Sequence, residues 1–354
     1  MRTRLLLVLL GFACNGNTAV VDAGIDAAPP QDVAVDSPVT KPDAGVVCHD
    51  GTTLLSTNVM LDRLGIANGF VYARVNANAY TPIGVMRCAT TGGCTAATSI
   101  LEDAGASVFQ DYAVGGSLYT TFLDDAGGGS VHAAMLDGTN DQILVADASF
   151  PSWVTTSGSN VFWVSDAITA GGTSPSVVYC AGCDAGSAWL SEPAATYAVF
   201  ADDRSVYLLA DDGTKTTEGI YGCSLDGGCI EGGARTLITG LVTDLPDQVA
   251  SDGTYVYVAR NDHSTIVRID TTNTATNFVT NVVALAIAID PASGTLFYGS
   301  VEGGIYSMPT DGSKPATELA TCSNATINSI VFDATNVYAL VDGTNTNLIY
   351  AAPR

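Results

Sequence analysis

Short apolar runs separated by polar turn residues occupy the chain from Cys48 to Arg354. One pattern recurs within them: a strand of small residues, a turn of Gly, Asn or Asp, and an apolar strand that carries an aromatic residue. Short strands with such turns between them favour an all-β protein. The pattern occurs as ANGFVY, VGGSLY, SGSNVF, DDRSVY, DGTYVY, ASGTLF and DATNVY.

The aromatic residues of this pattern serve as anchors for aligning the repeats: Tyr72, Tyr119, Phe162, Tyr207, Tyr257, Phe297 and Tyr338. Their successive spacings are 47, 43, 45, 50, 40 and 41 residues. A period of about 40–50 residues is typical of the four-stranded blades of a β-propeller. We therefore predict a single seven-bladed β-propeller, with six or eight blades as the alternatives if the repeats are miscounted.

The two ends of the repeat region complement each other. Each repeat continues into a third strand and then a fourth, but the seventh stops after its third strand, NLIYAAP. The segment GTTLLST, at residues 51–57, matches the fourth-strand pattern and precedes the first repeat. Because an unpaired final edge invites aggregation, we predict that this strand completes the last blade and closes the ring.

One predicted innermost strand, ALAIAID at residues 284–290, shows a strict alternation. Its alanines occupy one face and Leu285, Ile287 and Ile289 the other. Because strands crowd near a propeller axis, we expect the small-residue face to lie there.

The N-terminal region has the features of an export signal followed by a spacer. Arg2 and Arg4 precede a short apolar run, and residues 1–14 end in LGFAC, which resembles a bacterial lipobox except at Gly11 and Phe12. We expect lipidation of Cys14, with ordinary secretion as the alternative. Residues 15–47 are rich in Ala, Asp and Pro, so we expect a disordered tether ahead of a propeller spanning residues 48–354. A tail without function is the simpler interpretation of that segment.

The charge balance narrows the choice of partners. Charged residues make up 14% of the chain and the formal net charge is −23. This excess of acid argues against nucleic acid as a ligand. We expect a monomer that meets the membrane only through its lipid anchor, at the outer membrane or cell surface, and whose partner is a protein or a glycan.

Eight cysteines remain after Cys14, an even number that favours disulfides in an exported protein. Three pairs fall at the turn between the third and fourth strands of their own blades, where we predict hairpin disulfides rather than metal or redox sites: Cys88 with Cys94, Cys180 with Cys183, and Cys223 with Cys229. Cys48 and Cys322 then pair by elimination. Ideal strand directions place these two ends on opposite faces, so Cys48 would have to wrap across the blade.

The repeats TIVRIDTTN and GIYSMPTDGSKPATELA resemble those of the YWTD, NHL and TolB-like propellers. The resemblance covers most of residues 48–354 through turn and aromatic positions alone. Together with the tether and the cysteines, the whole chain is similar to an exported propeller lipoprotein of the bacterial surface. Such families include binding scaffolds and some enzymes, so the resemblance implies a fold rather than a reaction.

No catalytic motif is recognisable in the sequence. Its histidines are His49, His132 and His263, and none stands in a Ser/His/Asp, HExxH or Cys/His setting. The glycines lie in turns and form no phosphate-binding loop. We expect no cofactor, apart from the Ca²⁺ alternative considered next.

Two sets of polar positions emerge when the blades are aligned on their anchors. The first is an acidic face in the loops between second and third strands, suited to cations such as Ca²⁺ or to a basic partner, although Asp is also simply a good turn residue. Its members are Asp124, Asp125, Asp166, Asp211, Asp212, Asp262, Glu302 and Asp342, with Asn76 in the equivalent place of the first blade.

The second set is an axial mouth at the starts of the inner strands, where polar groups either bind a ligand or simply cap the strands. It comprises Asp62, Arg63, Asp111, Trp153, Tyr197, Asp247, Gln248 and Asn328. Convergence of Asp62, Asp111 and Asp247 on one point would favour an enzyme with its site at this mouth.

These observations favour a surface-tethered, non-enzymatic binding or scaffold propeller. The alternative is a lyase or hydrolase with its site at the axial mouth, with or without a divalent cation. A structural envelope component without a ligand is a third interpretation.

Overall fold

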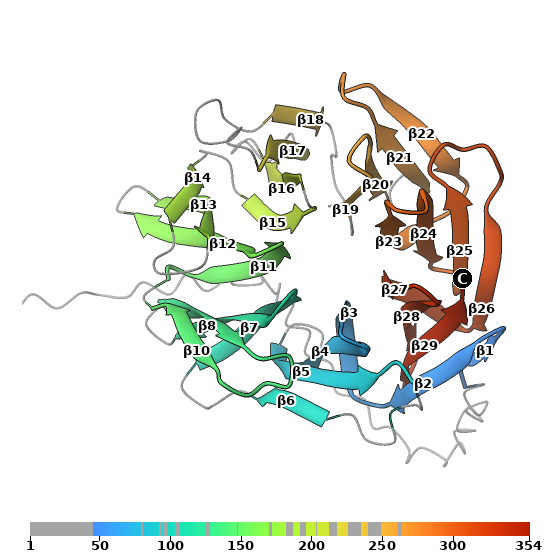
Figure 1. The fold of residues 1–354 in the computed structure, drawn as a ribbon, viewed down its shortest axis with the longest axis horizontal. Helices are drawn as coiled ribbons and strands as arrows, with labels where there is room; N and C mark the ends of the chain where they lie inside the picture. Colours follow the sequence, from blue (N-terminus) through green and yellow to red (C-terminus); the bar gives the residue numbers. More distant parts are fainter. Residues whose placement is uncertain are drawn as a thin grey trace, which may run out of the picture. The chain divides into compact units, whose positions relative to one another are not determined.

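The repeats form seven antiparallel sheets, six of four strands and one of five, which stand around a central axis (Figure 1). The structure is a computed structural model that describes residues 45–78, 81–91, 94, 98–102, 107–124, 128–146, 148–169, 172–181, 187–191, 196–202, 204–211, 218–225, 235–239, 249–260 and 264–354. Every regular element within these ranges is a β-strand. The prediction of a seven-bladed β-propeller is therefore confirmed.

The strands of each blade follow one another outward from the axis. The inner strands are β3 (Met60–Ala67), β7 (Ser107–Val114), β11 (Pro151–Ser157), β15 (Thr196–Ala201), β19 (Val249–Ser251), β23 (Ala284–Asp290) and β27 (Ala325–Phe332). The second strands are β4 (Phe70–Asn78), β8 (Leu118–Asp124), β12 (Asn160–Thr169), β16 (Ser205–Asp211), β20 (Val256–Arg260), β24 (Thr295–Ser300) and β28 (Asn336–Gly343). The third strands are β5 (Thr81–Ala89), β9 (Gly129–Ala134), β13 (Gly172–Ala181), β17 (Glu218–Ser224), β21 (Thr265–Ile269), β25 (Gly304–Pro309) and β29 (Asn347–Pro353). The fourth strands are β6 (Thr98–Glu102), β10 (Gln142–Val145), β14 (Ser187–Ser191), β18 (Arg235–Thr239), β22 (Ala275–Thr280), β26 (Thr317–Ser323) and, for blade 7, β2 (Thr52–Thr57).

The aromatic anchors lie where the repeats predict, on the second strands between neighbouring blades. Tyr72, Phe162, Tyr257, Phe297 and Tyr338 are almost completely buried. In three blades the anchor hydroxyl also donates to an aspartate five residues earlier, and that aspartate accepts backbone N–H groups of the turn between them. The pairs are Tyr207–Asp202 (2.9 Å), Tyr257–Asp252 (3.2 Å) and Tyr338–Asp333 (2.7 Å). Each such aspartate fixes the turn and satisfies a phenol that packing has removed from water.

The ring is closed by the strand that the sequence predicts. β2 pairs antiparallel with β29, with Thr52 opposite Ala351 and Thr57 opposite Asn347. Leu54 and Leu55 of β2 are buried in a cluster that contains residues of blades 1 and 7. Blade 7 therefore has no open outer edge along β29, and its closure joins the two ends of the described chain.

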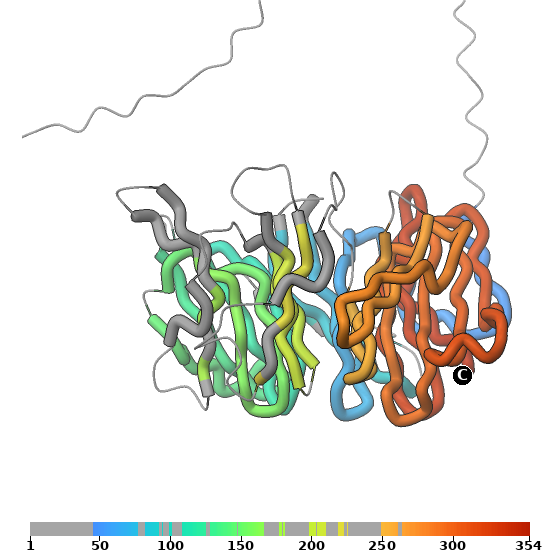
Figure 2. Tube along the Cα trace, turned by 90° about the horizontal axis from the view of Figure 1, so that it is seen from above, coloured from blue at the N-terminus to red at the C-terminus, as the bar shows by residue number. Residues whose placement is uncertain are grey.

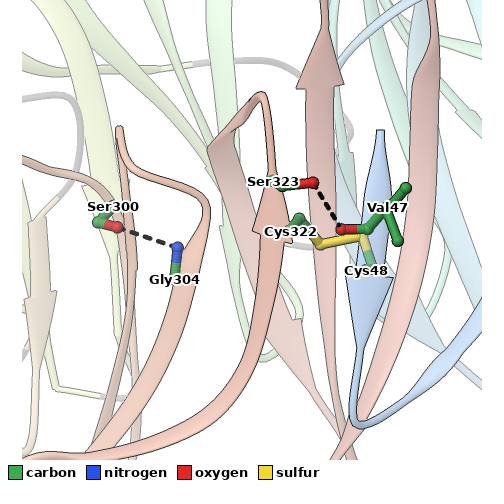
Figure 3. The surroundings of a disulfide bond; sticks show 6 residues. All are labelled: Val47, Cys48, Ser300, Gly304, Cys322 and Ser323. Atoms are coloured by element: carbon green, nitrogen blue, oxygen red, sulfur yellow. Dashed lines mark hydrogen bonds between the residues drawn. A yellow bond between two sulfur atoms is a disulfide. The ribbon is translucent and has the colours of Figure 1, made fainter. Parts of the chain in front are cut away.

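A second N-terminal strand, which the sequence did not reveal, extends blade 6. β1 (Val47–His49) pairs antiparallel with β26, placing Cys48 opposite Cys322, and these two cysteines form a disulfide (Figure 3). Ser323 Oγ also donates to the Val47 carbonyl at 3.3 Å. The expected wrap across the blade is unnecessary, because the chain passes along blade 6 as a fifth strand and then turns at Asp50 and Gly51 into β2.

Two other cysteines form a disulfide across their own blade, Cys88 with Cys94. The amide of Cys94 also donates to the Leu54 carbonyl of β2 at 2.8 Å, so this turn supports the closing strand. Cys180 is disulfide-bonded as well, whereas the side chains of Cys183, Cys223 and Cys229 lie outside the described residues.

The alternation expected for β23 is interrupted. Leu285 has no partner on β24, because the register shifts between Ala284 and Ala286. Ala284 consequently packs with Ile287 and Ile289 in one cluster, whereas Ala286 packs in the cluster of blade 7. Both faces of an inner strand thus contact neighbouring blades, and the expectation that the small-residue face lines the axis is wrong.

Residues 43–354 form one compact unit, whose strands run between two faces of turns (Figure 2). Among the described residues no helix is long and apolar enough to cross a membrane. The predicted export signal and nearly all of the tether lie outside the described residues.

Candidate functional site

The inner strands share a β-bulge near the starts of the strands. In six blades the pairing between first and second strands skips one residue: Arg63, Gln110, Trp153, Tyr197, Leu285 and Asn328. An extra residue in one strand leaves its backbone unpaired and turns its side chain away from the regular alternation. The bulged residues thus lie at one end of the axis, and those that line the cavities there include Arg63, Trp153 and Asn328.

Two of the bulged residues have unusual backbone angles. Arg63 and Trp153 both have φ of 39°, a left-handed conformation that side chains other than glycine seldom adopt. Such conformations require surrounding structure to hold them and gather at functional sites. The Tyr112 hydroxyl provides part of that support in blade 1, because it donates to the Arg63 carbonyl at 2.9 Å.

Two adjoining cavities open at this end of the axis. The larger measures about 280 Å³ and is lined by Asp62, Arg63, Arg74, Trp153, Phe200, Leu285 and Asn328, from blades 1, 3, 4, 6 and 7. The second measures about 210 Å³ and is lined by Asp62, Arg74, Asn76, Pro82, Gln110, Asp111, Ser152 and Trp153. We call the two together the axial mouth. Three side chains line both cavities, so a single ligand could contact both.

A network of two arginines and two aspartates forms one wall of the mouth. Arg74 binds Asp62 through two hydrogen bonds, of 2.5 Å to Oδ1 and 2.7 Å to Oδ2, and reaches Asp111 Oδ1 at 3.1 Å. Arg63 donates to Asp111 Oδ2, which also accepts the backbone N–H of Val154 at 3.0 Å. Paired in this way, the four charges of the network cancel.

The network keeps Arg74 charged in a partly buried place. Burial opposes the guanidinium charge, but the hydrogen bond to Asp62 and the charge of Asp111 raise the pKa of Arg74 above its ordinary value. Asp111, whose side chain is only 3% exposed, depends on these cations in turn, because an unpaired buried carboxylate is strongly disfavoured.

Two aromatic side chains, Trp153 and Phe200, lie beside the charged wall. The Arg63 guanidinium lies over the Trp153 ring at 5.6 Å, and the Trp153 and Phe200 rings are 6.3 Å apart. Even with these contacts Trp153 is 38% exposed. The mouth therefore offers an apolar surface next to fixed hydrogen-bonding groups, which is the usual composition of a small-ligand site.

The structure brings together most of the predicted mouth residues that it describes. Asp62, Arg63, Asp111, Trp153 and Asn328 all lie at the mouth. Tyr197 occupies the bulge of β15, but its side chain lies outside the described residues, as do Asp247 and Gln248 entirely. The predicted meeting of acids takes a different form: Asp62 and Asp111 both bind the guanidinium of Arg74. Sequence reasoning missed Arg74, Phe200 and Leu285 as mouth residues, and it assigned Asn76 to the acidic face instead.

The predicted acidic face is partly described. Asp124 accepts the Gly128 amide at 2.8 Å within its own turn, Asp342 accepts from Asn328 at the mouth at 3.2 Å, and Glu302 is exposed in the turn after β24. The side chains of Asp166 and Asp211, and the whole of Asp125, Asp212 and Asp262, lie outside the described residues. Within the described part of the chain no group of three or more His, Cys, Asp or Glu side chains could hold a metal ion.

One histidine does stand in a Ser/His/Asp arrangement, contrary to the sequence interpretation. His132 Nε2 lies 2.8 Å from Ser130 Oγ, and its Nδ1 lies 2.9 Å from Asp141 Oδ2. The three residues belong to β9 and to the turn before β10, on the outer half of blade 2. Ser130 and His132 are two residues apart on one strand and so share a face, which was the available signal. Asp141 joins them only through the turn.

Comparisons with known proteins support the fold alone. No protein-family model and no curated protein matches the chain. Among solved structures, puromycin hydrolase has a TM-score of 0.57 at 14% identity, over 80% of this chain and 50% of that one. The computationally designed Ika8 protein has a TM-score of 0.51 at 13% identity, over 82% and 83% of the two chains. Chaetomium thermophilum Raptor has a TM-score of 0.56 at 10% identity, over 85% and 29%. The chain thus spans about half the length of the hydrolase, and at these identities the likeness is one of propeller architecture.

Proposed function

We propose that this chain is an exported, surface-tethered propeller that binds a protein or glycan ligand at its axial mouth without transforming it. The observation that carries the proposal is the composition of the mouth, an exposed tryptophan beside a neutral, fully paired wall of two arginines and two aspartates. Such a site is organised for contact before any ligand arrives.

The pairing of the acids favours binding over catalysis. A general acid or base must exchange a proton with its substrate, and a metal ligand must leave its lone pairs free for the ion. Asp62 and Asp111 instead accept hydrogen bonds from the guanidinium groups of Arg74 and Arg63, so their lone pairs are already engaged. These two carboxylates are therefore better suited to fixing side chains in place than to proton transfer.

The ligand-binding proposal is tested with variants of the mouth. Trp153→Ala and Arg63→Ala should each weaken binding of ligands selected from peptide and glycan arrays by at least tenfold. Ile143→Ala, which removes an exposed apolar side chain from blade 2, should bind as the parent does. Binding that is equal in all four proteins would place the ligand elsewhere and refute the proposal.

The proposed tether rests on the N-terminal sequence and is tested separately. Cys14→Ser should move the protein from the detergent phase to the aqueous phase and abolish incorporation of labelled fatty acid. Recovery of the parent protein in the aqueous phase, without label, would instead indicate ordinary secretion.

A hydrolase is the second candidate function, favoured by the Ser130–His132–Asp141 contacts. In that role Ser130 Oγ would attack an activated ester while His132 Nε2 accepts its proton. A fluorophosphonate probe should then label Ser130 by losing fluoride, and Ser130→Ala or His132→Ala should abolish the label. An unlabelled Ser130 in the folded parent would remove this candidate.

A further inference from the structure

We propose that the ligand of the axial mouth is an uncharged, hydroxyl-rich carbohydrate, which stacks on Trp153 and donates a hydroxyl hydrogen bond to Asn76. The inference rests on the proposed function, since it assumes that the mouth is the binding site. It adds the chemical class of the ligand and the atom that receives its hydroxyl.

Asn76 carries an unused acceptor at the mouth. The residue is only 5% exposed and lines the smaller cavity, and its Oδ1 is itself buried just behind the cavity wall, without a hydrogen-bond partner among the described residues. Its Nδ2 donates to Asp62 Oδ2 at 2.7 Å. Because a carboxylate can only accept, this contact fixes the orientation of the amide and leaves Oδ1 as the free atom.

A buried acceptor without a donor is unfavourable, so the site is completed by a group that brings one. A hydroxyl group meets this need and can accept a hydrogen bond in return. The Gln110 side chain and the Ser152 hydroxyl group line the same cavity and provide donors. A ligand with several neighbouring hydroxyls could satisfy these groups together.

The charges at the mouth select against ions of either sign. An anionic ligand would be repelled by the field of a chain whose formal net charge is −23, and a cationic one would have to displace Arg63 or Arg74 from the carboxylates that they already pair. A neutral ligand avoids both penalties. It also leaves the Arg74–Asp62 hydrogen bonds undisturbed, so that binding does not have to break the network.

Trp153 provides the complementary apolar contact. A pyranose presents a face of C–H groups, and an indole ring combines a large apolar face with little conformational freedom. The strained bulge holds this ring at the cavity edge, where it remains 38% exposed. Cavities of about 280 and 210 Å³ suit one end of a glycan better than a folded protein surface.

The test measures binding of simple sugars to the full, oxidised chain by saturation-transfer NMR and tryptophan fluorescence. The neutral probes are glucose, galactose, mannose and N-acetylglucosamine. The charged probes are glucuronate, an anion, and glucosamine, a cation. At least one neutral sugar should bind, and its charged analogue should bind at least tenfold more weakly. Asn76→Leu should cost at least tenfold in affinity, Trp153→Phe less than Trp153→Ala, and Ile143→Ala nothing.

The outcomes separate the two proposals. If no neutral sugar binds but a peptide does so in a Trp153-dependent manner, the carbohydrate inference is wrong and the function of the mouth stands. If no probe depends on Trp153, both are wrong. Should Asn76→Leu fail to fold, the side-chain amide resonance of Asn76 in the parent protein decides, because it must shift on addition of the sugar.

Discussion

The ring closure and the axial mouth use polar groups in opposite ways. At the closure, β1 and β2 form the outer edges of blades 6 and 7, and a disulfide joins Cys48 to Cys322. Arg354 binds Asp290 nearby, and its guanidinium lies 5.0 Å from the centre of the Phe297 ring. At the mouth, Arg63 and Trp153 have left-handed backbone angles. The buried amide oxygen of Asn76 there lacks a hydrogen-bond partner among the described residues. Pairing at the periphery stabilises the ring, whereas at the axis two residues within inner strands, Arg63 and Trp153, are held in left-handed conformations beside a cavity.

The largest expected effect comes from removing the closing disulfide. Its cysteines are 274 residues apart, so the chain-entropy model predicts that Cys48→Ala with Cys322→Ala lowers the free energy of unfolding by about 5.6 kcal/mol. Cys88→Ala with Cys94→Ala, at a separation of 6, should cost only about 2 kcal/mol. Guanidinium unfolding of the oxidised proteins measures both. Equal losses would show that loop length is not the source of the stability.

At the mouth, the largest effect should follow Asp111→Asn. The amide preserves the shape but removes the charge that compensates Arg63 and Arg74, so we expect a loss of about 3 kcal/mol, as for other broken buried ion pairs. Thermal and denaturant unfolding report the change. Asp137→Asn, at an exposed aspartate that binds its own turn, is the matched control and should unfold with the parent. Coincident curves for all three proteins would mean that the network contributes no stability.

The ion pair at the closure should be sensitive to acid. The hydrogen bond from Arg354 lowers the pKa of Asp290 to about 2, from an ordinary value of 3.8. A lowered folded-state pKa adds stability above the unfolded value, and this contribution is lost as the pH falls towards 2. Arg354→Met should therefore cost about 1–2 kcal/mol at pH 7, and the difference from the parent should shrink between pH 4 and pH 2. A constant difference across that range would assign the effect to lost ring contacts instead.

The smallest effect is expected at the strained bulge. Trp153→Gly removes an exposed side chain but relieves a φ of 39°, so the two effects should nearly cancel in the free energy of unfolding. Ile143→Gly, at an exposed site of β10, has no such strain to relieve and should cost about 1 kcal/mol. Urea unfolding can compare them, and a larger loss for Trp153→Gly would show that the bulge is not strained. Ligand binding should disappear in Trp153→Gly alone, which separates function from stability.

Most of the fold could be predicted from the sequence, because the blades of a propeller repeat along the chain. Aromatic anchors such as Tyr72 and Tyr338 recur with a blade-sized period and lie buried between blades, and the missing fourth strand of blade 7 could be recognised at residues 51–57. β1 could not be recognised in the same way, because a strand of three residues has no period of its own.

The candidate site was less accessible from the sequence. Asp62 and Asp111 were predicted at the mouth, but their partner Arg74 lies on the second strand, and only the pairing register brings it opposite Asp62. The bulges are equally hidden, because one extra residue changes no composition and yet re-aims Arg63 and Trp153. The contact of Asp141 with His132 likewise depends on the path of a turn, which neither residue type nor spacing specifies.

The arrangement of β1 and β2 also sets an order of assembly. Cys48 precedes its disulfide partner by 274 residues, and β2 must wait for β29 before its edge is paired. A growing chain therefore carries a free thiol and an unpaired strand until its last blades have formed. Pairing of Cys48 with Cys322 thus records that blade 6 has formed, and a chain interrupted before β26 keeps the Cys48 thiol without its native partner.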